Sequence, residues 1–316
     1  MRSADHDRVQ LAENVGMTAL QLVPRVATVE AFDLAEGPIW DAAGDRLLWV
    51  DINAGLVLAG TLTAAGMIEV RERVELAETV GAVAPGPDGS WLVAGAERLH
   101  VRSREGHVTP GPRVLPPDSG RRLNDGKPEP GGRYVVGSLS LTGASTTEEL
   151  VVVDGAGVHR IDTDLTLSNG LAWSADGRTM FSVDTLRRVV YRRGWDPATG
   201  SAGQRDVFVR LADGSPDGIC LDESEHLWVA IWGLGQVHRY APDGTLANLV
   251  EIPAPHTSSV AFAGPALETL VITTARSDLA PDELAQYPGS GHLFTLEPGV
   301  RGLPVARWAG PVPGSS

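Results

Sequence analysis

The chain has 316 residues, a length that suits either two ordinary domains or one large all-β domain. Hydrophobic residues make up 42% of it and charged residues 21%, as in folded proteins, while 37 Gly and 22 Pro indicate many turns. The formal net charge of −14 argues against a nucleic-acid-binding protein, because contact with phosphates needs a basic surface.

Cysteine content and hydropathy bear on the compartment. The single cysteine, Cys220, cannot form an internal disulfide and lies in an apolar run, so we expect it to be packed in the core. The first twenty residues lack the continuous apolar stretch of a secretory signal, and no later segment is long and apolar enough to cross a bilayer. We therefore expect a cytoplasmic protein, a monomer or weak homo-oligomer, with no nucleic-acid or membrane partner.

In chain order, the first expected element is an N-terminal extension over residues 1–22, either a short helix or a mobile segment. Residues 23–316 are expected to form one domain of short strands. Within it a small residue opens an apolar run six times, at intervals of 44, 45, 44, 48 and 41 residues. These six residues are Gly37, Gly81, Gly126, Gly170, Gly218 and Ser259. Six copies near one period indicate a repeat architecture.

Each copy continues with a turn and a second β-rich run. The turns include AAGD at 42–45, PDGS at 87–90, PGGR at 130–133 and ADGR at 175–178, and the runs that follow them are RLLWVD, WLVAGA, YVVGSL and TMFSVD. Gly-containing turns between such runs are hairpin signals. A third strand is expected in most copies, for example at 189–193, 236–240 and 292–296.

Repeats of about 40–45 residues with about four short strands each are typical of β-propeller blades. We therefore predict an all-β fold, a single six-bladed β-propeller with four-stranded antiparallel blades. A pair of β-sandwiches is the alternative fold, but it does not explain the constant repeat phase. To close the ring, the strand-like segment 26–32 is expected to complete the blade that ends near residues 305–310. No helix is expected after residue 22.

The residues just before the six aligned positions are the candidates for chemistry. Because the first strand of each blade lines the central channel, equivalent positions converge on one axis. They are Glu36, Val80, Asp125, Asn169, Asp217 and Ser258. Crowded carboxylates repel one another, and a divalent cation is the simplest compensation, with oxygen ligands favouring Ca²⁺ or Mg²⁺. The alternative is that each Asp-Gly or Asn-Gly pair only forms a turn.

Longer motifs point to a family. LAEGPIWD, RRLNDGKPEPGGRYVVGSL, SNGLAWSADGRTMFSVDT, PDGICLDESEHLWVAIWGLGQVHRYAPDG and PGVRGLP, in this order, resemble the senescence-marker-protein (regucalcin)/gluconolactonase/luciferin-regenerating-enzyme family over roughly residues 30–310. The resemblance implies a six-bladed propeller that binds one divalent metal at the channel mouth and hydrolyses lactones of sugar acids. It implies Glu36, Asn169 and Asp217 as the metal ligands.

The R-x-N-D-G-K motif of the same family falls on residues 122–127. The resemblance implies that Arg122, Asn124 and Asp125 bind substrate, with Asn124 close enough to the metal to contact it through water. The alternative for Arg122 is a solvated loop charge beside Arg121.

The sequence departs from the family at one place. Sugar-lactone members carry acidic residues where this chain has Thr142, and Glu148 and Glu149 come later in the sequence. A less hydroxylated or bulkier ester is therefore an alternative substrate.

We predict hydrolysis of a small-molecule lactone, with one cation polarising the carbonyl oxygen while water attacks. Ca²⁺ is the first choice, and Zn²⁺, Mn²⁺ and Mg²⁺ are alternatives. Asp217 is the predicted catalytic residue, either as a general base for water, as a ligand only, or as a nucleophile toward activated phosphoesters. Two other functions stay open: phosphotriester hydrolysis at the same site, and a non-enzymatic propeller that binds protein partners.

Overall fold

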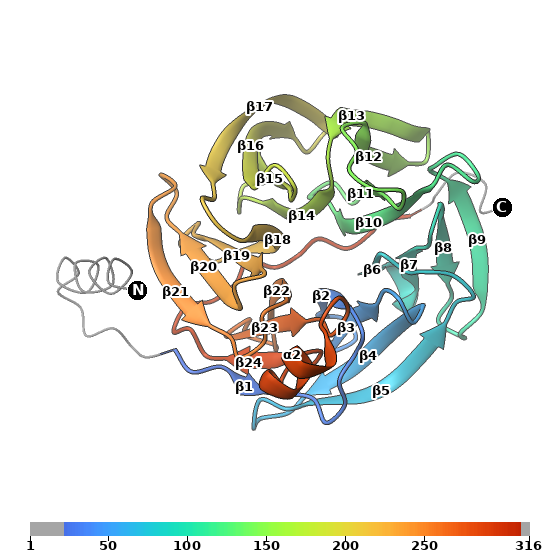
Figure 1. Ribbon diagram of the computed structural model, residues 1–316. Coiled ribbons are helices and arrows are strands. Elements are labelled where there is room, and N and C mark those ends of the chain that lie inside the picture. Colours follow the sequence, from blue (N-terminus) through green and yellow to red (C-terminus); the bar gives the residue numbers. More distant parts are fainter. Residues whose placement is uncertain (1–21, 311–316) are drawn as a thin grey trace.

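The computed structural model describes residues 22–310, which form a ring of six four-stranded antiparallel sheets around a central axis (Figure 1). This confirms the predicted six-bladed β-propeller. The expected N-terminal extension, apart from its last residue, and residues 311–316 lie outside the described residues. Within residues 22–310, no helix is long and apolar enough to cross a membrane.

Five blades are each built from four consecutive strands, whose order in the sheet follows the chain. In blade 1 these are β2 (Ala35–Asp41), β3 (Arg46–Asp51), β4 (Leu56–Leu62) and β5 (Ile68–Glu75). In blade 2 they are β6 (Ala82–Pro85), β7 (Trp91–Ala94), β8 (Arg98–Arg102) and β9 (Val108–Arg113). In blade 3 they are β10 (Arg121–Pro128), β11 (Tyr134–Ser140), β12 (Glu148–Asp154) and β13 (Gly157–Leu165).

The next two blades follow the same pattern. Blade 4 consists of β14 (Ser168–Trp173), β15 (Thr179–Asp184), β16 (Val189–Asp196) and β17 (Ser201–Arg210). Blade 5 consists of β18 (Ser215–Leu221), β19 (Leu227–Trp232), β20 (Gln236–Tyr240) and β21 (Leu246–Glu251). The first strand of each blade lies nearest the axis and contacts the first strand of the next blade (Figure 1). We call the face where these inner strands begin the site face, and the face where they end the far face.

The sixth blade joins the two ends of the chain. It consists of β22 (Thr257–Ala263), β23 (Thr269–Thr274), β24 (Phe294–Leu296) and the N-terminal strand β1 (Arg25–Val26), which pairs with β24. Ala27 extends this contact by donating a backbone hydrogen bond to Leu293 O at 2.7 Å. Closure of the ring by an N-terminal strand is therefore confirmed, although the strand is two residues long and lies earlier than 26–32.

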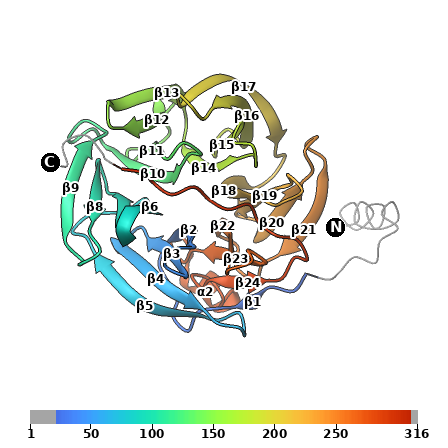
Figure 2. The same cartoon turned by 180° about the vertical axis from the view of Figure 1, so that it is seen from behind.

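The other half of the closure prediction is wrong, because residues 305–310 form no blade strand. The C-terminal segment, residues 299–310, instead crosses the far face of the ring (Figure 2). Its backbone N–H groups bond to the ends of inner strands and to a hairpin: Leu303 to Leu221 O, Trp308 to Pro85 O and Ala309 to Gly132 O. The alternating apolar residues of this segment resemble a strand in sequence, but they pack against the cores of several blades.

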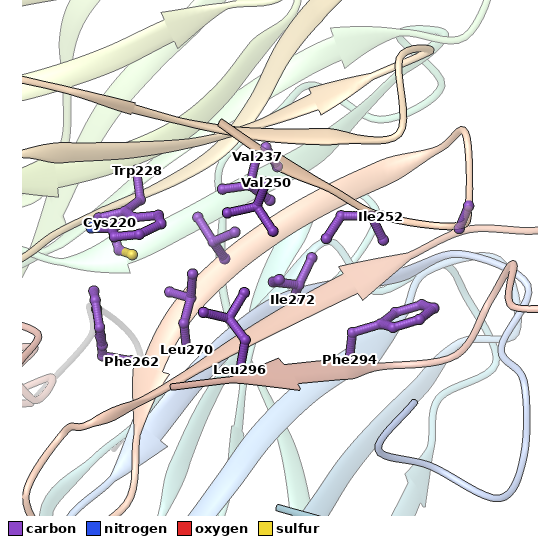
Figure 3. Close-up of a cluster of buried hydrophobic side chains, with 13 residues drawn as sticks. Cys220, Trp228, Val237, Val250, Ile252, Phe262, Leu270, Ile272, Phe294 and Leu296 are labelled. Carbon is purple, nitrogen blue, oxygen red and sulfur yellow. The ribbon is translucent and has the colours of Figure 1, made fainter. Parts of the chain in front are cut away.

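The hydrophobic core lies between neighbouring blades. Between blades 5 and 6 it includes Cys220, Trp228 and Phe262, and the two aromatic rings meet edge to face with centroids 6.0 Å apart (Figure 3). Within β23, Leu270 and Ile272 face blade 5 while Val271 faces blade 1. This alternation is the period of a strand buried on both faces. Cys220 is buried with a free thiol, as expected.

One short helix contradicts the expectation of no helix after residue 22. Helix α2 (Pro281–Gln286) lies in the long connection between β23 and β24. Pro281 occupies its first turn, and the Glu283 side chain accepts a hydrogen bond from Ala280 N at 2.9 Å. Six residues are too few to produce a helical hydrophobic period, and end signals alone mark this element.

Candidate metal and active site

The inner strands are irregular at the positions where the small residues of the sequence repeat lie. Their pairing with the second strand shifts register just after Glu36, Leu123, Asn169, Pro216 and Thr257. Such bulges occur at the rims of closed sheets and beside active sites, where they redirect a side chain. Here they lie at the site-face end of the channel, next to the predicted site residues.

Close approach of neighbouring inner strands explains the small residues of the repeat. A Cβ atom on Gly170 would lie 2.4 Å from Asp217 O, and one on Gly218 would lie 1.9 Å from Ser259 Oγ. Neither position has room for a larger side chain. Gly81, Gly170 and Gly218 are thus points where one blade meets the next, and the residue before each of them is brought to the channel mouth. Gly126 is instead crowded by Tyr134 of its own blade, and Gly37 has a positive φ of 54°.

Three carboxyl groups are buried together at this mouth: Glu36, Asp125 and Asp217. Burial, and then the charge of Asp125, raises the pKa of Glu36 to about 8. Burial and the charges of Glu36 and Asp125 raise the pKa of Asp217 well above its usual value. Burial also raises the pKa of Asp125, and the nearby Lys127 charge opposes this rise.

The Glu36 and Asp217 carboxyls are close enough to share a hydrogen bond. Two ionised carboxylates cannot form one, because neither supplies a proton. The pair therefore favours a bound proton or a cation between its oxygens.

Two buried oxygens in this cluster have no hydrogen-bond partner among the described residues: Asn169 Oδ1 and Asp217 Oδ1. The amide of Asn169 is held from its other side, because Nδ2 donates to Thr185 Oγ1 at 3.2 Å and that hydroxyl donates to Pro216 O at 2.9 Å. Glu36 accepts a bond from Gly37 N at 2.7 Å through Oε2. Buried polar atoms usually have partners, so the unpartnered oxygens indicate a place for a ligand.

This donor set fits a hard divalent cation. Among residues 22–310, no group of three or more His, Cys, Asp and Glu side chains is arranged to hold a metal. Beside Glu36 and Asp217, the unpartnered amide oxygen of Asn169 would be the third donor. A set of two carboxylates and one amide oxygen matches the preference of Ca²⁺ and Mg²⁺ for oxygen ligands.

Arg122 lies beside the carboxyl cluster. Its side chain is buried, burial lowers its pKa to about 10, and the charges of Glu36 and Asp217 oppose this decrease. Its Nη1 donates to Asn124 Oδ1 at 2.8 Å and to Leu123 O at 2.9 Å. The alternative of a solvated loop charge is wrong for Arg122. Arg121, the preceding residue of the strand, extends from its opposite face and pairs with Glu148 at 3.0 Å.

Asn124 fixes the position of Arg122. While its Oδ1 accepts from Arg122, its Nδ2 donates to Ser168 O in the next blade at 2.9 Å. Asp125 Oδ1 accepts a bond from Gly126 N at 2.8 Å. The structure therefore brings Arg122, Asp125, Glu36 and Asp217 together and places Asn124 behind the guanidinium.

Sequence reasoning missed Thr185 and the role of Lys127. Thr185 directly follows β15 and links Asn169 to blade 5. Lys127 Nζ donates to Ile219 O at 3.1 Å and lowers the pKa of Asp125 by its charge. The family motifs contain both residues, but only the positions of their neighbours in space reveal these contacts.

A cavity of about 460 Å³ lies away from the carboxyl cluster, at the far-face end of the inner strands. Its walls include Lys127, Trp173, Cys220 and residues Leu303 to Ala306 of the C-terminal segment. The channel therefore has a polar end at the site face and a mainly apolar end at the far face.

Known proteins with similar sequences and folds match almost the whole chain. The family model described as SMP-30/Gluconolactonase/LRE-like region matches residues 34–276. The pentonolactonase XacC of Haloferax volcanii is 32% identical over 284 residues, which cover 87% of this chain and 94% of that protein. A 6-deoxy-6-sulfogluconolactonase of Pseudomonas putida is 32% identical over 286 residues, 88% of this chain and 95% of that protein. A solved structure described as a calcium-binding protein, regucalcin, from Agrobacterium tumefaciens is 28% identical, covers 91% of this chain and 97% of its own, and superposes with a TM-score of 0.83.

Proposed function

Because the chain belongs to the SMP-30/gluconolactonase/LRE-like family, we propose that it is a divalent-cation-dependent hydrolase that opens the ring of a small-molecule lactone. The names of the relatives support the lactone as the substrate class. One structural observation supports the cation: Asn169 Oδ1 and Asp217 Oδ1 are buried at the channel mouth without hydrogen-bond partners in the described part of the chain.

Glu36, Asn169 and Asp217 would hold the cation. We propose Ca²⁺, in keeping with the description of the Agrobacterium tumefaciens relative as calcium-binding. Zn²⁺, Mn²⁺ and Mg²⁺ are the alternatives that a metal titration separates. When bound, the cation would supply a positive charge that polarises the lactone carbonyl oxygen and stabilises negative charge developing there.

Asp217 is the proposed catalytic residue. Its raised pKa suits a carboxylate that takes a proton from the attacking water as the water oxygen bonds to the carbonyl carbon. When the ring C–O bond breaks, the same carboxyl returns the proton to the ring oxygen, which leaves as a hydroxyl. The product is the open hydroxy acid, and the carboxylate is regenerated.

Arg122 and its neighbours would orient the lactone. The Arg122 guanidinium faces the carboxyl cluster and keeps donors beyond those used by Asn124 and Leu123. It would hold an oxygen of the substrate in place, and Asn124 would fix the guanidinium plane. The Asp125 carboxylate, turned toward Gly126 N, adds negative charge that favours a cation at the mouth.

A panel assay tests this function. Chelated protein is reloaded with each cation and mixed with sugar lactones, aliphatic lactones and a phosphotriester, and acid release is followed. We expect lactone hydrolysis that disappears on chelation and returns with Ca²⁺. Asp217→Asn should abolish it, while Asp206→Asn on the outer strand β17 should not. Turnover of the phosphotriester alone would replace the lactonase assignment, and no turnover together with no thermal shift by any cation would favour a binding scaffold.

A further inference from the structure

Two leucines are exposed on neighbouring blades at the site face. Leu141 directly follows β11 and is 63% exposed, and Leu186 lies in the turn between β15 and β16 and is 54% exposed. Both turns belong to the site face, because β11 and β15 run antiparallel to β10 and β14 and end where those inner strands begin. Exposed leucines are common on protein surfaces, and only the position of these two at the rim makes them candidates for ligand contact.

Backbone contacts link these leucines to the proposed site. Leu139 pairs with Arg122 across the first hairpin of blade 3 and forms a β-bridge with Leu167. Leu167 O accepts a hydrogen bond from Thr185 N at 3.1 Å, and the Thr185 side chain holds Asn169.

Leu141 is two residues beyond Leu139, and Leu186 directly follows Thr185. The two leucines therefore lie on the site-face rim of blades 3 and 4, the two blades that carry Arg122 and Asn169. Leu141 is itself anchored, since its N–H donates to Gly120 O at 2.8 Å.

The two carboxylates that follow Leu141 in the chain, at the start of β12, are engaged within blade 3. Glu148 is buried and accepts hydrogen bonds from Arg121 Nε at 3.0 Å and Ser138 Oγ at 2.7 Å. Glu149 pairs with Arg160 at 3.2 Å. Both carboxylates are thus engaged by arginines on their own blade.

The nearest hydroxyls are partly engaged as well. Those of Ser140 and Thr142 hydrogen-bond to each other at 3.2 Å. Besides these hydroxyls, this part of the rim presents the apolar surface of Leu141 and Leu186 to a substrate.

We propose that the preferred substrate is a lactone that carries an apolar substituent, such as an alkyl chain on the ring carbon next to the ring oxygen. Leu141 and Leu186 contact that substituent while Arg122 holds an oxygen of the ring. This inference rests on the proposed function and names its substrate class. Full burial of a methylene group increases affinity by about fourfold, so each methylene of a chain lying on these leucines contributes up to that factor.

A substrate series measures this contribution. The Ca²⁺-loaded protein is assayed with δ-valerolactone, δ-hexalactone, δ-octalactone, δ-decalactone and D-glucono-1,5-lactone. We expect kcat/KM to rise by about two- to fourfold per methylene over the alkyl series, and δ-octalactone to exceed gluconolactone. In Leu141→Ser/Leu186→Ser the ratio of δ-decalactone to δ-valerolactone should fall by about tenfold. In Leu249→Ser, a leucine 42% exposed on the outer strand β21, the ratio should not change.

Binding of the corresponding alkyl-substituted δ-lactams, which resist hydrolysis, separates the two claims. If lactam affinity rises with chain length and the double variant removes the rise, the contact of Leu141 and Leu186 with an alkyl substituent stands even if no lactone turns over, and the proposed function fails alone. If gluconolactone is the better substrate, or if the double variant leaves both slopes unchanged, the inference is overturned while the lactonase activity stands.

Discussion

The hydroxyl of Thr185 accepts a hydrogen bond from Asn169 Nδ2 at 3.2 Å and donates one to Pro216 O at 2.9 Å. This pair of bonds holds the amide through its nitrogen and leaves Asn169 Oδ1 buried without a hydrogen-bond partner among residues 22–310. Thr185 thus acts on the proposed cation site without contacting the cation.

Thr185→Val keeps the shape of the side chain and removes the acceptor for Asn169 Nδ2. We expect Ca²⁺ affinity to fall by about 10- to 100-fold, as for other residues that orient a metal ligand. Calorimetric titration measures this change. Thr179→Val, at the opposite end of β15, is the matched control and should bind as the wild type does. Equal affinity in the two variants would show that the amide needs no support.

Without metal, the stability of the protein should depend on pH through Glu36. Because its folded pKa is about 8 and its ordinary value is 4.5, the folded state binds more protons between these values, and stability should fall as pH rises. Burial lowers the pKa of His238 to about 4, so this residue makes stability rise with pH up to about its ordinary value of 6.5. The range from about pH 6.5 to 8 therefore isolates the carboxyl effect.

Urea unfolding of chelated protein across that range checks this prediction. The unfolding midpoint should decrease toward pH 8, and Glu36→Gln should reduce the decrease. Adding Ca²⁺ at 100 times its Kd should stabilise the protein by about 2.7 kcal/mol. A midpoint that rises toward pH 8 in the chelated wild type would contradict the pKa assigned to Glu36.

Asp217→Asn removes one charge from the cluster and the proposed proton acceptor together. We expect turnover to fall by at least about 10²-fold, the usual contribution of a positioned general base. The chelated variant should be more stable than chelated wild type at pH 8, because folding of the wild type requires Asp217 either to bury its charge or to bind a proton that the unfolded chain releases, and the amide requires neither. Rate assays and thermal unfolding measure the two effects. A variant that is inactive but less stable without metal would point to a folding defect.

Phe262→Ala tests the contact between blades 5 and 6. The ring is buried against Trp228 and beside Gly302 of the C-terminal segment, so its removal should cost about 3–5 kcal/mol of unfolding free energy. Leu249→Ala on the outer strand β21 should change stability by less than about 0.5 kcal/mol. Denaturant unfolding of both variants provides the comparison, and a similar small change in both would mean that the inter-blade core adds little.

The sequence is sufficient to predict the repeat, because the close approach of neighbouring inner strands allows only small residues at certain positions. Gly218 is required where its neighbour Ser259 approaches the axis, and Gly170 where Asp217 does, so small residues recur at one phase. That phase points to Glu36, Asp125, Asn169 and Asp217, and the family resemblance selects Glu36, Asn169 and Asp217 among them as metal ligands, a role that stays a prediction.

The parts that could not be predicted depend on partners distant in the sequence. Residues 305–310 alternate like a strand, and only their contacts with Pro85 and Gly132 show that they cross the far face. Arg121 and Arg122 are adjacent, so the direction of each depends on the register shift in β10, which the sequence does not reveal. Thr185 ends one of the family motifs, but its role depends on the nearby Pro216 carbonyl, which the motif does not reveal.

The most direct test is a crystal structure of the protein grown with Mn²⁺, with anomalous diffraction recorded on both sides of the manganese absorption edge. The cation should produce one strong peak at the channel mouth, within coordination distance of oxygens from Glu36, Asn169 and Asp217. Maps without a peak among these three side chains, from crystals that bind manganese elsewhere or not at all, would contradict the proposed cation site and the hydrolytic mechanism built on it.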